Sequence, residues 1–164
     1  MSDITYIKVG RIWLYLAVVL DLFSRKVIGW ALDTHMREAL ILEAFTMAVS
    51  RRDIQDNVLL HSDRGVQYRG HEYQAALEES GILCSMSRKG NCWDNAVMES
   101  FFSRLKVELI YAENYTHVED ARAGIFEYIE LFYNRVRRHS AIGYTSPAGY
   151  EQRFENLTVS TICG

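Results

Sequence analysis

The feature that most constrains the fold of this chain is the apolar run IWLYLAVVL at residues 12–20. A run of this length is about half of what a membrane-spanning helix needs. Its β-branched and aromatic residues favour a strand. Because both sets of alternate side chains are apolar, the pattern is typical of a central strand covered on both faces. We predict such a strand over residues 12–23.

Two shorter strand patterns flank this run, DITYIKV at residues 3–9 and KVIGWAL at residues 26–32. Gly10 lies in the first connection and the tripeptide SRK in the second. Connections this short are typical of antiparallel hairpins. The first three strands should therefore form one antiparallel sheet.

Helix and strand patterns alternate over much of the remaining chain. We expect helices at 37–50, 70–80, 94–112 and 117–136, and strands at 57–62 and 82–86. Strands that are joined through a helix usually lie parallel in one sheet. The sequence thus predicts an α/β fold with a five-stranded mixed sheet, its first three strands antiparallel, flanked by helices on both faces.

Charge and cysteine content narrow the class of protein. The net charge of -3 is not the basic balance of a stand-alone DNA-binding domain, so DNA binding would depend on local basic patches or bound cations. The three cysteines form no CxxC pair, which suggests a reducing compartment and a cytoplasmic location. Because no apolar run is long enough to span a bilayer, we expect no membrane partner.

Three acidic residues stand where ligands often bind. Asp3 begins the first strand, Asp63 ends a later strand beside Gly65, and Glu99 lies early in a predicted helix. Strand ends in open α/β sheets are frequent ligand sites. The 35 residues between Asp63 and Glu99 leave room for a helix, a strand and a loop that fold the two carboxylates together.

Carboxylate oxygens suit magnesium or manganese. Three carboxylates can hold two such ions, which stabilise the attacking and leaving oxygens in phosphodiester cleavage or strand transfer. Each acid also has a structural alternative, because aspartates are common turn residues and a glutamate in a first helical turn complements the helix dipole. Asp21, which precedes the SRK turn, is a rival to Asp3 for the first position.

Five segments of the sequence form long and specific motifs. They are DITYI, WLYLAVVLDLFSRKVIGWAL, HSDRGVQY, SRKGNCWDNAVMESFFSRLKVE and YNRVRRHSAIGYTSPAGYE. Together they resemble the catalytic core of bacterial insertion-sequence transposases of the OrfB type, which are related to retroviral integrases. The resemblance runs from about residue 2 to residue 152.

The resemblance implies a ribonuclease H-like fold and a DDE polynucleotidyl transferase. Asp3, Asp63 and Glu99 match the three acids of the family, which implies that they are catalytic and bind two Mg²⁺ (or Mn²⁺) ions. The implied reaction is 3′-end hydrolysis of insertion-sequence DNA followed by strand transfer. The implied partners are element-end DNA, target DNA and further copies of the chain, as a dimer or a larger oligomer.

Similar transposases carry a DNA-binding region before the first strand, where this chain has only Met-Ser. We therefore expect a catalytic core at 1–152, a C-terminal tail at 153–164 and no N-terminal DNA-binding region within this chain. Asp3 lies near the chain start, where ends commonly fray. One alternative function is a catalytically inactive module that binds DNA or self-associates, and another is a ribonuclease H-type nuclease.

Basic residues near the acids and near the last predicted helix are candidates for DNA contacts. These candidates are Arg88, Lys89, Lys106, Arg135, Arg137 and Arg138. Such residues would position the phosphate backbone without reading its sequence. Cations at a helix end also complement the helix dipole. Arg104 is either part of the same basic edge or an ordinary solvated charge.

Overall fold

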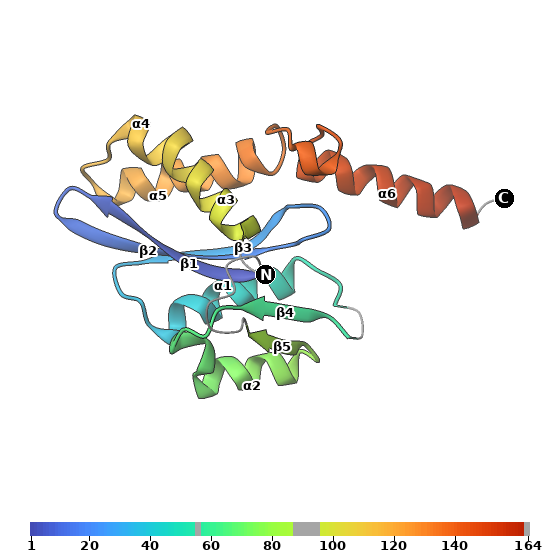
Figure 1. The fold of residues 1–164 in the computed structure, drawn as a ribbon, viewed down its shortest axis with the longest axis horizontal. Helices are drawn as coiled ribbons and strands as arrows, with labels where there is room; N and C mark the ends of the chain where they lie inside the picture. The colour runs from blue at the N-terminus through green and yellow to red at the C-terminus, as the bar shows by residue number, and fades with distance from the viewer. Residues whose placement is uncertain (55–56, 87–95, 163–164) are drawn as a thin grey trace.

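A three-stranded antiparallel sheet lies at the centre of the molecule in this computed structural model (Figure 1). Its strands are β1 (Ser2–Val9), β2 (Ile12–Leu20) and β3 (Val27–Asp33), and β2 is the middle strand. The antiparallel order and the central place of the apolar run are therefore confirmed. The structure describes residues 1–54, 57–86 and 96–162, with side chains as far as residue 155.

Strand β2 is buried on both faces. Leu16 and Val18 belong to one hydrophobic core, whereas Ala17 and Val19 belong to a second. Alternate side chains of a strand point to opposite faces, so one strand joins the two cores. Burying a side chain such as Leu16 contributes about 1.5–3 kcal/mol, which explains why this run dominates the fold.

Strand β2 ends at Leu20, before the predicted end at Phe23. The Asp21 carboxylate accepts the backbone N–H of Phe23 at 2.8 Å, and the Asp21 N–H donates to the carbonyl of Lys26 at 2.9 Å. These bonds form a turn and leave the Phe23 side chain exposed. The apolar character of Phe23 had suggested a longer strand.

The last two strands are separate from the central sheet. Strands β4 (Leu59–Ser62) and β5 (Leu83–Met86) form a parallel pair, accompanied by α1 (Glu38–Ser50) and α2 (His71–Glu79). The expected five-stranded sheet is thus divided into three and two strands. In the described structure, strands β4 and β5 are only four residues long and form no ladder with the central sheet. Side-chain packing in the second core joins them to that sheet.

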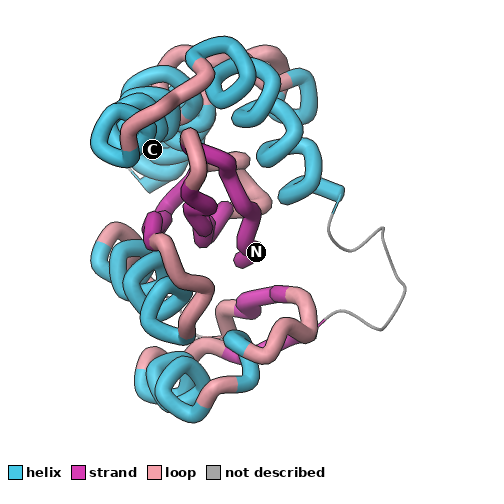
Figure 2. The backbone as a smooth tube through the Cα atoms, turned by 90° about the vertical axis from the view of Figure 1, so that its left-hand side faces the viewer, coloured by secondary structure: helices cyan, strands magenta, loops and turns pink. Residues whose placement is uncertain are grey.

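The opposite face of the central sheet carries a second helical layer. Helix α3 (Ala96–Leu105) runs through a π-helical turn (Lys106–Ile110) into α4 (Tyr111–Glu113). Helix α5 (Val118–Phe126) continues as a π-helical segment (Glu127–Tyr133). Figure 2 shows the strands between the two helical layers, which confirms helices on both faces.

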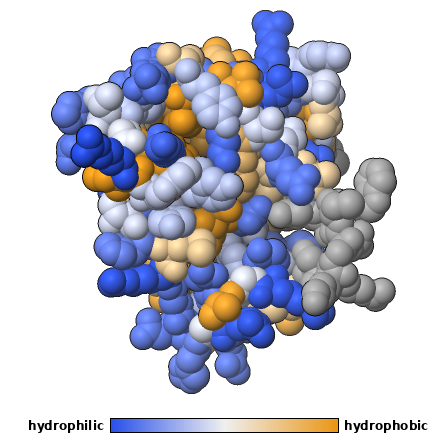
Figure 3. Space-filling model, turned by 60° about the vertical axis from the view of Figure 1, so that its left-hand side comes forward, coloured by the Kyte–Doolittle hydropathy of each residue, from blue (hydrophilic) through white to orange (hydrophobic). Residues whose placement is uncertain are grey.

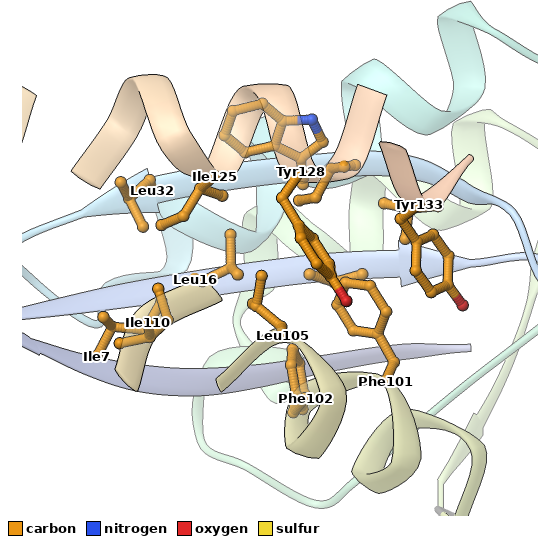
Figure 4. Close-up of a cluster of buried hydrophobic side chains, with 14 of the residues drawn as sticks. Ile7, Leu16, Leu32, Phe101, Phe102, Leu105, Ile110, Ile125, Tyr128 and Tyr133 are labelled. Carbon is orange, nitrogen blue, oxygen red and sulfur yellow. The ribbon is translucent and has the colours of Figure 1, made fainter. Parts of the chain in front are cut away.

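The larger core lies between this second layer and the sheet. Leu105 of α3 and Ile125 of α5 are fully buried against Leu16 of β2 (Figure 4). Tyr128 and Phe101 extend the same core toward the turn between β2 and β3. The core therefore holds α3, and with it the early turn that carries Glu99, against the central sheet.

Helix α6 (Pro147–Ile162) points away from the sheet (Figure 1) and continues past residue 152, where the tail was expected to begin. Its Glu151 forms ion pairs with Lys26 and Arg52. Among the residues described, no helix is both long and apolar enough to cross a membrane. On the face shown in Figure 3, hydrophilic side chains surround smaller hydrophobic areas.

Candidate active site

Asp3 lies on β1, half-buried and opposite Val18 of β2. One of its carboxylate oxygens accepts the backbone N–H of Ile4 at 2.8 Å. Met1 and Leu20 exchange two backbone hydrogen bonds, of 2.7 and 2.8 Å. The residues before and after Asp3 in the chain are thus both paired with β2.

Asp63 directly follows β4, and its side chain is exposed. Its carboxylate accepts the backbone N–H of Gly65 at 2.8 Å, so a local turn orients the acid. A Cβ atom on Gly65 would lie 2.9 Å from the carboxylate oxygen of Asp63 and 3.1 Å from the side-chain oxygen of Gln67. A side chain at position 65 would therefore have to displace the Asp63 carboxylate or the Gln67 side chain.

Tyr68 joins the segments that carry the two aspartates. Its side chain is 1% exposed, and its hydroxyl lies 3.1 Å from the Ser2 hydroxyl. Burial raises the pKa of Tyr68 well above its ordinary value, and the charges of Asp3 and Asp63 raise this pKa further. The Ser2–Tyr68 contact therefore joins the strand that carries Asp3 to the segment that follows Asp63, although residues 4–62 separate the two aspartates in the sequence.

Glu99 lies in the first turn of α3, and its side chain is exposed. Within the described residues, no three His, Cys, Asp or Glu side chains are close enough together to hold a metal ion. The Ser2–Tyr68 contact thus joins the segments that carry Asp3 and Asp63, but Asp3, Asp63 and Glu99 do not form one metal-binding cluster in this structure. Arg88 and Lys89, in the connection to α3, lie outside the described residues.

Asp21, the rival for the first acidic position, has a structural role. Its carboxylate accepts the Phe23 N–H at 2.8 Å and forms an ion pair with Arg52 at 3.1 Å. Arg52 also pairs with Glu151 of α6. These contacts make Asp21 part of the connection between the β2–β3 turn, α1 and α6.

The basic candidates are distributed over different surroundings. Lys106 is partly buried, with its ammonium 4.9 Å from the centre of the Tyr6 ring, and burial lowers its pKa. Arg137 forms a bidentate ion pair with Glu108, with N–O distances of 2.7 and 2.9 Å. Tyr128 also donates to Glu108 at 2.7 Å. Neighbouring basic residues in the sequence therefore do not all share the same surroundings.

Arg135, Arg137 and Arg138 lie close together in the sequence, and we call them the basic cluster. Arg135 and Arg138 face two different hollows. Arg135 lines a polar pocket with Arg51 and Arg52. Arg138 lines a groove of about 540 Å³ with Arg25, Arg104 and Arg137. We call this second hollow the basic groove. The sequence offered no sign that Arg25, in the turn between β2 and β3, would meet Arg138, because the two are remote in the chain.

Family comparison covers both parts of the candidate site. The family model described as "Integrase core domain" matches residues 1–92, and a second model with the same description matches residues 80–147. The first match includes Asp3 and Asp63, and the second includes Glu99 and the basic cluster.

The chain is also similar to bacterial transposases. Transposase InsF for insertion sequence IS3A of Escherichia coli (strain K12) is 50% identical over 152 residues, which are 93% of this chain and 53% of the relative. The transposase for insertion sequence element IS904 of Lactococcus lactis subsp. lactis (strain IL1403) is 42% identical over 152 residues, which are 93% of this chain and 60% of that relative. The chain thus spans between half and two thirds of these curated relatives.

Solved structures show the same fold. The catalytic core domain of HTLV-2 integrase in complex with magnesium, in its trimeric form, has a TM-score of 0.66 and 15% identity, over 91% of this chain and 92% of that chain. The catalytic core domain of BIV integrase has a TM-score of 0.66 and 18% identity, over 96% and 97%. The expected ribonuclease H-like fold and the resemblance to insertion-sequence transposases are confirmed, and this chain belongs to the integrase core domain family.

Proposed function

We propose that this chain is the catalytic core of a DDE transposase that acts on insertion-sequence DNA. Membership of the integrase core domain family and the similarity to transposases support the proposal. The observation that carries it is the buried contact between the Ser2 and Tyr68 hydroxyls, which joins the strand that carries Asp3 to the segment that follows Asp63.

The proposed ligands of two Mg²⁺ (or Mn²⁺) ions are Asp3, Asp63 and Glu99. All three supply carboxylate oxygens, which are the donors these ions prefer. Asp63 and Glu99 are exposed, so their carboxylates are accessible to an ion and to a substrate. When bound, the ions would stabilise the attacking and leaving oxygens of a phosphodiester. The HTLV-2 integrase core, which shares the fold, was solved in complex with magnesium.

The proposed reaction has two steps, hydrolysis at the 3′ ends of the element and transfer of the new 3′-hydroxyl to target DNA. The chain's own contribution is to orient the carboxylates: the Ile4 and Gly65 N–H groups hold Asp3 and Asp63, and the first turn of α3 presents Glu99. The proposed DNA contacts are Arg88, Lys89, Lys106, Arg135, Arg137 and Arg138. Bringing two element ends together would require a homo-oligomer, and we place the reaction in the cytoplasm.

A nicking and strand-transfer assay tests the proposal. The substrates are labelled DNA with the terminal repeats of IS3 and a supercoiled plasmid, which needs no end recognition. We expect products only with Mg²⁺ or Mn²⁺, and their loss in Glu99→Gln. Glu113→Gln is the matched control, because Glu113 is an exposed glutamate on α4, in the same helical layer. Unchanged activity in Glu99→Gln would remove Glu99 from the site.

Two further measurements separate the alternative functions. Preferential cleavage of an RNA–DNA hybrid over duplex DNA would indicate a ribonuclease H-type nuclease. Calorimetric titration with Mg²⁺ and Mn²⁺ addresses the inactive module: we expect binding that weakens in Glu99→Gln. Absence of metal binding, together with a stable dimer in solution, would favour an inactive binding or self-association module.

A further inference from the structure

The basic groove brings together arginines from three distant parts of the chain. Arg25 comes from the turn between β2 and β3, Arg104 from α3, and Arg138 from the segment after α5. Within the described part of the chain, no acidic side chain lines the groove. Although the whole chain carries a net charge of -3, this surface is locally positive.

Three of the four groove arginines form no ion pair in the described structure. They are Arg25, Arg104 and Arg138, whereas Arg137 is engaged by Glu108. Glu108 therefore holds Arg137 as part of the wall. The charge of Arg104 also acts on Glu108 and helps to lower the pKa of that carboxyl. Burial lowers the pKa of His139, also in the wall, to about 4. Its ring is thus uncharged at neutral pH, and arginines supply the positive charge of the groove.

The walls of the groove are tied together by hydrogen bonds. The Tyr133 hydroxyl donates to the carbonyl of Arg25 at 3.1 Å. The side-chain amide of Asn134 pairs with the backbone N–H and C=O of Val27, both at 2.9 Å. These bonds hold the backbone of the β2–β3 turn against the segment that carries Arg138.

The groove lies along one side of α3. Val97, Ser100 and Arg104 line it from one face of this helix, whereas Glu99 is not among the lining residues. Helical periodicity places Glu99 on another face of α3, so phosphates bound to the arginines would follow the same helix without facing that carboxylate. Tyr144, at the rim and 72% exposed, offers an aromatic face on which a base can stack.

We propose that Arg25, Arg104 and Arg138 form a phosphate-binding site that holds one stretch of DNA backbone against α3, the helix that also carries Glu99. This inference rests on the proposed function, because that function makes DNA the polyanion in question. The proposal adds two arginines outside the basic cluster, Arg25 and Arg104, to the DNA contacts. Arg137 then forms part of the groove wall and does not itself bind the phosphate. Guanidinium groups suit this ligand because they donate two parallel hydrogen bonds to a phosphate.

Fluorescence anisotropy with a labelled DNA duplex in EDTA tests the groove without the metal site. We expect Arg25→Gln, Arg104→Gln and Arg138→Gln each to weaken binding and to reduce the slope of log Kd against log salt by about 1, since each removes one phosphate contact. Arg11→Gln, in the exposed β1–β2 turn, is the control and should bind like the wild type. Thermal unfolding of every variant checks folding.

The outcomes separate this proposal from the proposed function. Folded groove variants that bind DNA with the affinity and salt slope of Arg11→Gln would overturn the groove, even if metal-dependent strand transfer is present. Loss of binding in the groove variants, in a protein without any metal-dependent turnover, would support the groove and refute the catalytic proposal.

Discussion

The acidic site and the basic groove are built in different ways. Asp3 and Asp63 are each oriented by a backbone N–H one or two residues further along the chain. The role of Arg137, by contrast, is decided by Glu108, which lies on another helical segment. Local chain geometry thus orients the carboxylates. Contacts between distant segments, by contrast, determine which arginines are held in an ion pair and which can bind a ligand.

Removing the charge of Asp63 is the most severe test of this comparison. In Asp63→Asn the amide oxygen can still accept the Gly65 N–H, so the turn should remain while the anionic ligand is lost. We expect metal-dependent activity to fall by about 100-fold or more, which is several kcal/mol of transition-state stabilisation. Strand-transfer rates measure this, with the exposed Asp120→Asn as control. A variant with wild-type activity would contradict the proposed site.

Tyr68→Phe tests whether the two acidic segments depend on one tertiary contact. The substitution leaves the buried Ser2 hydroxyl without its Tyr68 partner, so we expect unfolding stability to fall by about 1–3 kcal/mol. Denaturant titration measures the loss, and magnesium calorimetry shows whether the ligands shift with it. Tyr144→Phe, at an exposed position, should change stability by less than about 0.5 kcal/mol. Equal effects at both tyrosines would argue against the joining role of Tyr68.

Gly65→Ala tests whether the local turn orients the Asp63 carboxylate. The new Cβ atom would press on the Asp63 carboxylate, so we expect magnesium affinity to fall by about 10-fold. Gly81→Ala is the contrasting variant, because Gly81 has open space but a φ of +67°. It should cost about 1–2 kcal/mol of stability and leave magnesium binding unchanged. Calorimetry and thermal unfolding distinguish the two patterns, and identical patterns would refute the spatial argument.

Glu108→Gln tests the groove and should cause the smallest change in the free energy of unfolding. Hydrogen bonds from Arg137 hold the pKa of Glu108 below its ordinary 4.5. The pair therefore contributes stability above pH 4.5, and this contribution is lost as pH falls through the lowered pKa. Because the pair is partly exposed, we expect a loss below about 1 kcal/mol at pH 7.

Denaturant titrations of wild type and Glu108→Gln at pH 7 and pH 3 check this sign. The difference in stability between the two proteins should shrink at the lower pH. Release of Arg137 should also strengthen DNA binding at low salt. A difference in stability that grows as the pH falls would contradict the assigned pair.

Much of the fold was predictable because the signals were local. The uninterrupted apolar run placed β2 at the centre, and the short turns beside it made its neighbours antiparallel. The apolar stripes of α3 and α5 placed helices on the larger core. The end of β2 was predicted too late because Asp21 bonds to the Phe23 backbone, a competition that apolar patterning does not report. The division of the sheet depends on packing between segments, which periodicity does not encode.

The candidate site was predictable to a similar degree. The acids Asp3, Asp63 and Glu99 stood out through strand ends, a helix start and the family motifs, although the Ser2–Tyr68 contact joins only the segments that carry the first two. Tyr68 was missed even though it lies in the same motif as Asp63, because an isolated tyrosine is most often a core residue. Arg25 was missed because nothing in its turn indicates which segment will pack against it.

The sequence by itself determined the strand and helix order, the turn that orients Asp63 and the membership of this family, since each depends on residues close together in the chain. Tertiary structure alone decided that Tyr68 would contact Ser2 beside Asp3, that Glu108 would engage Arg137, and that Arg25 and Arg138 would line one groove. The physical reason is that hydrogen bonds and ion pairs act over a few ångströms of space, and only the packed cores determine which distant residues come within that range.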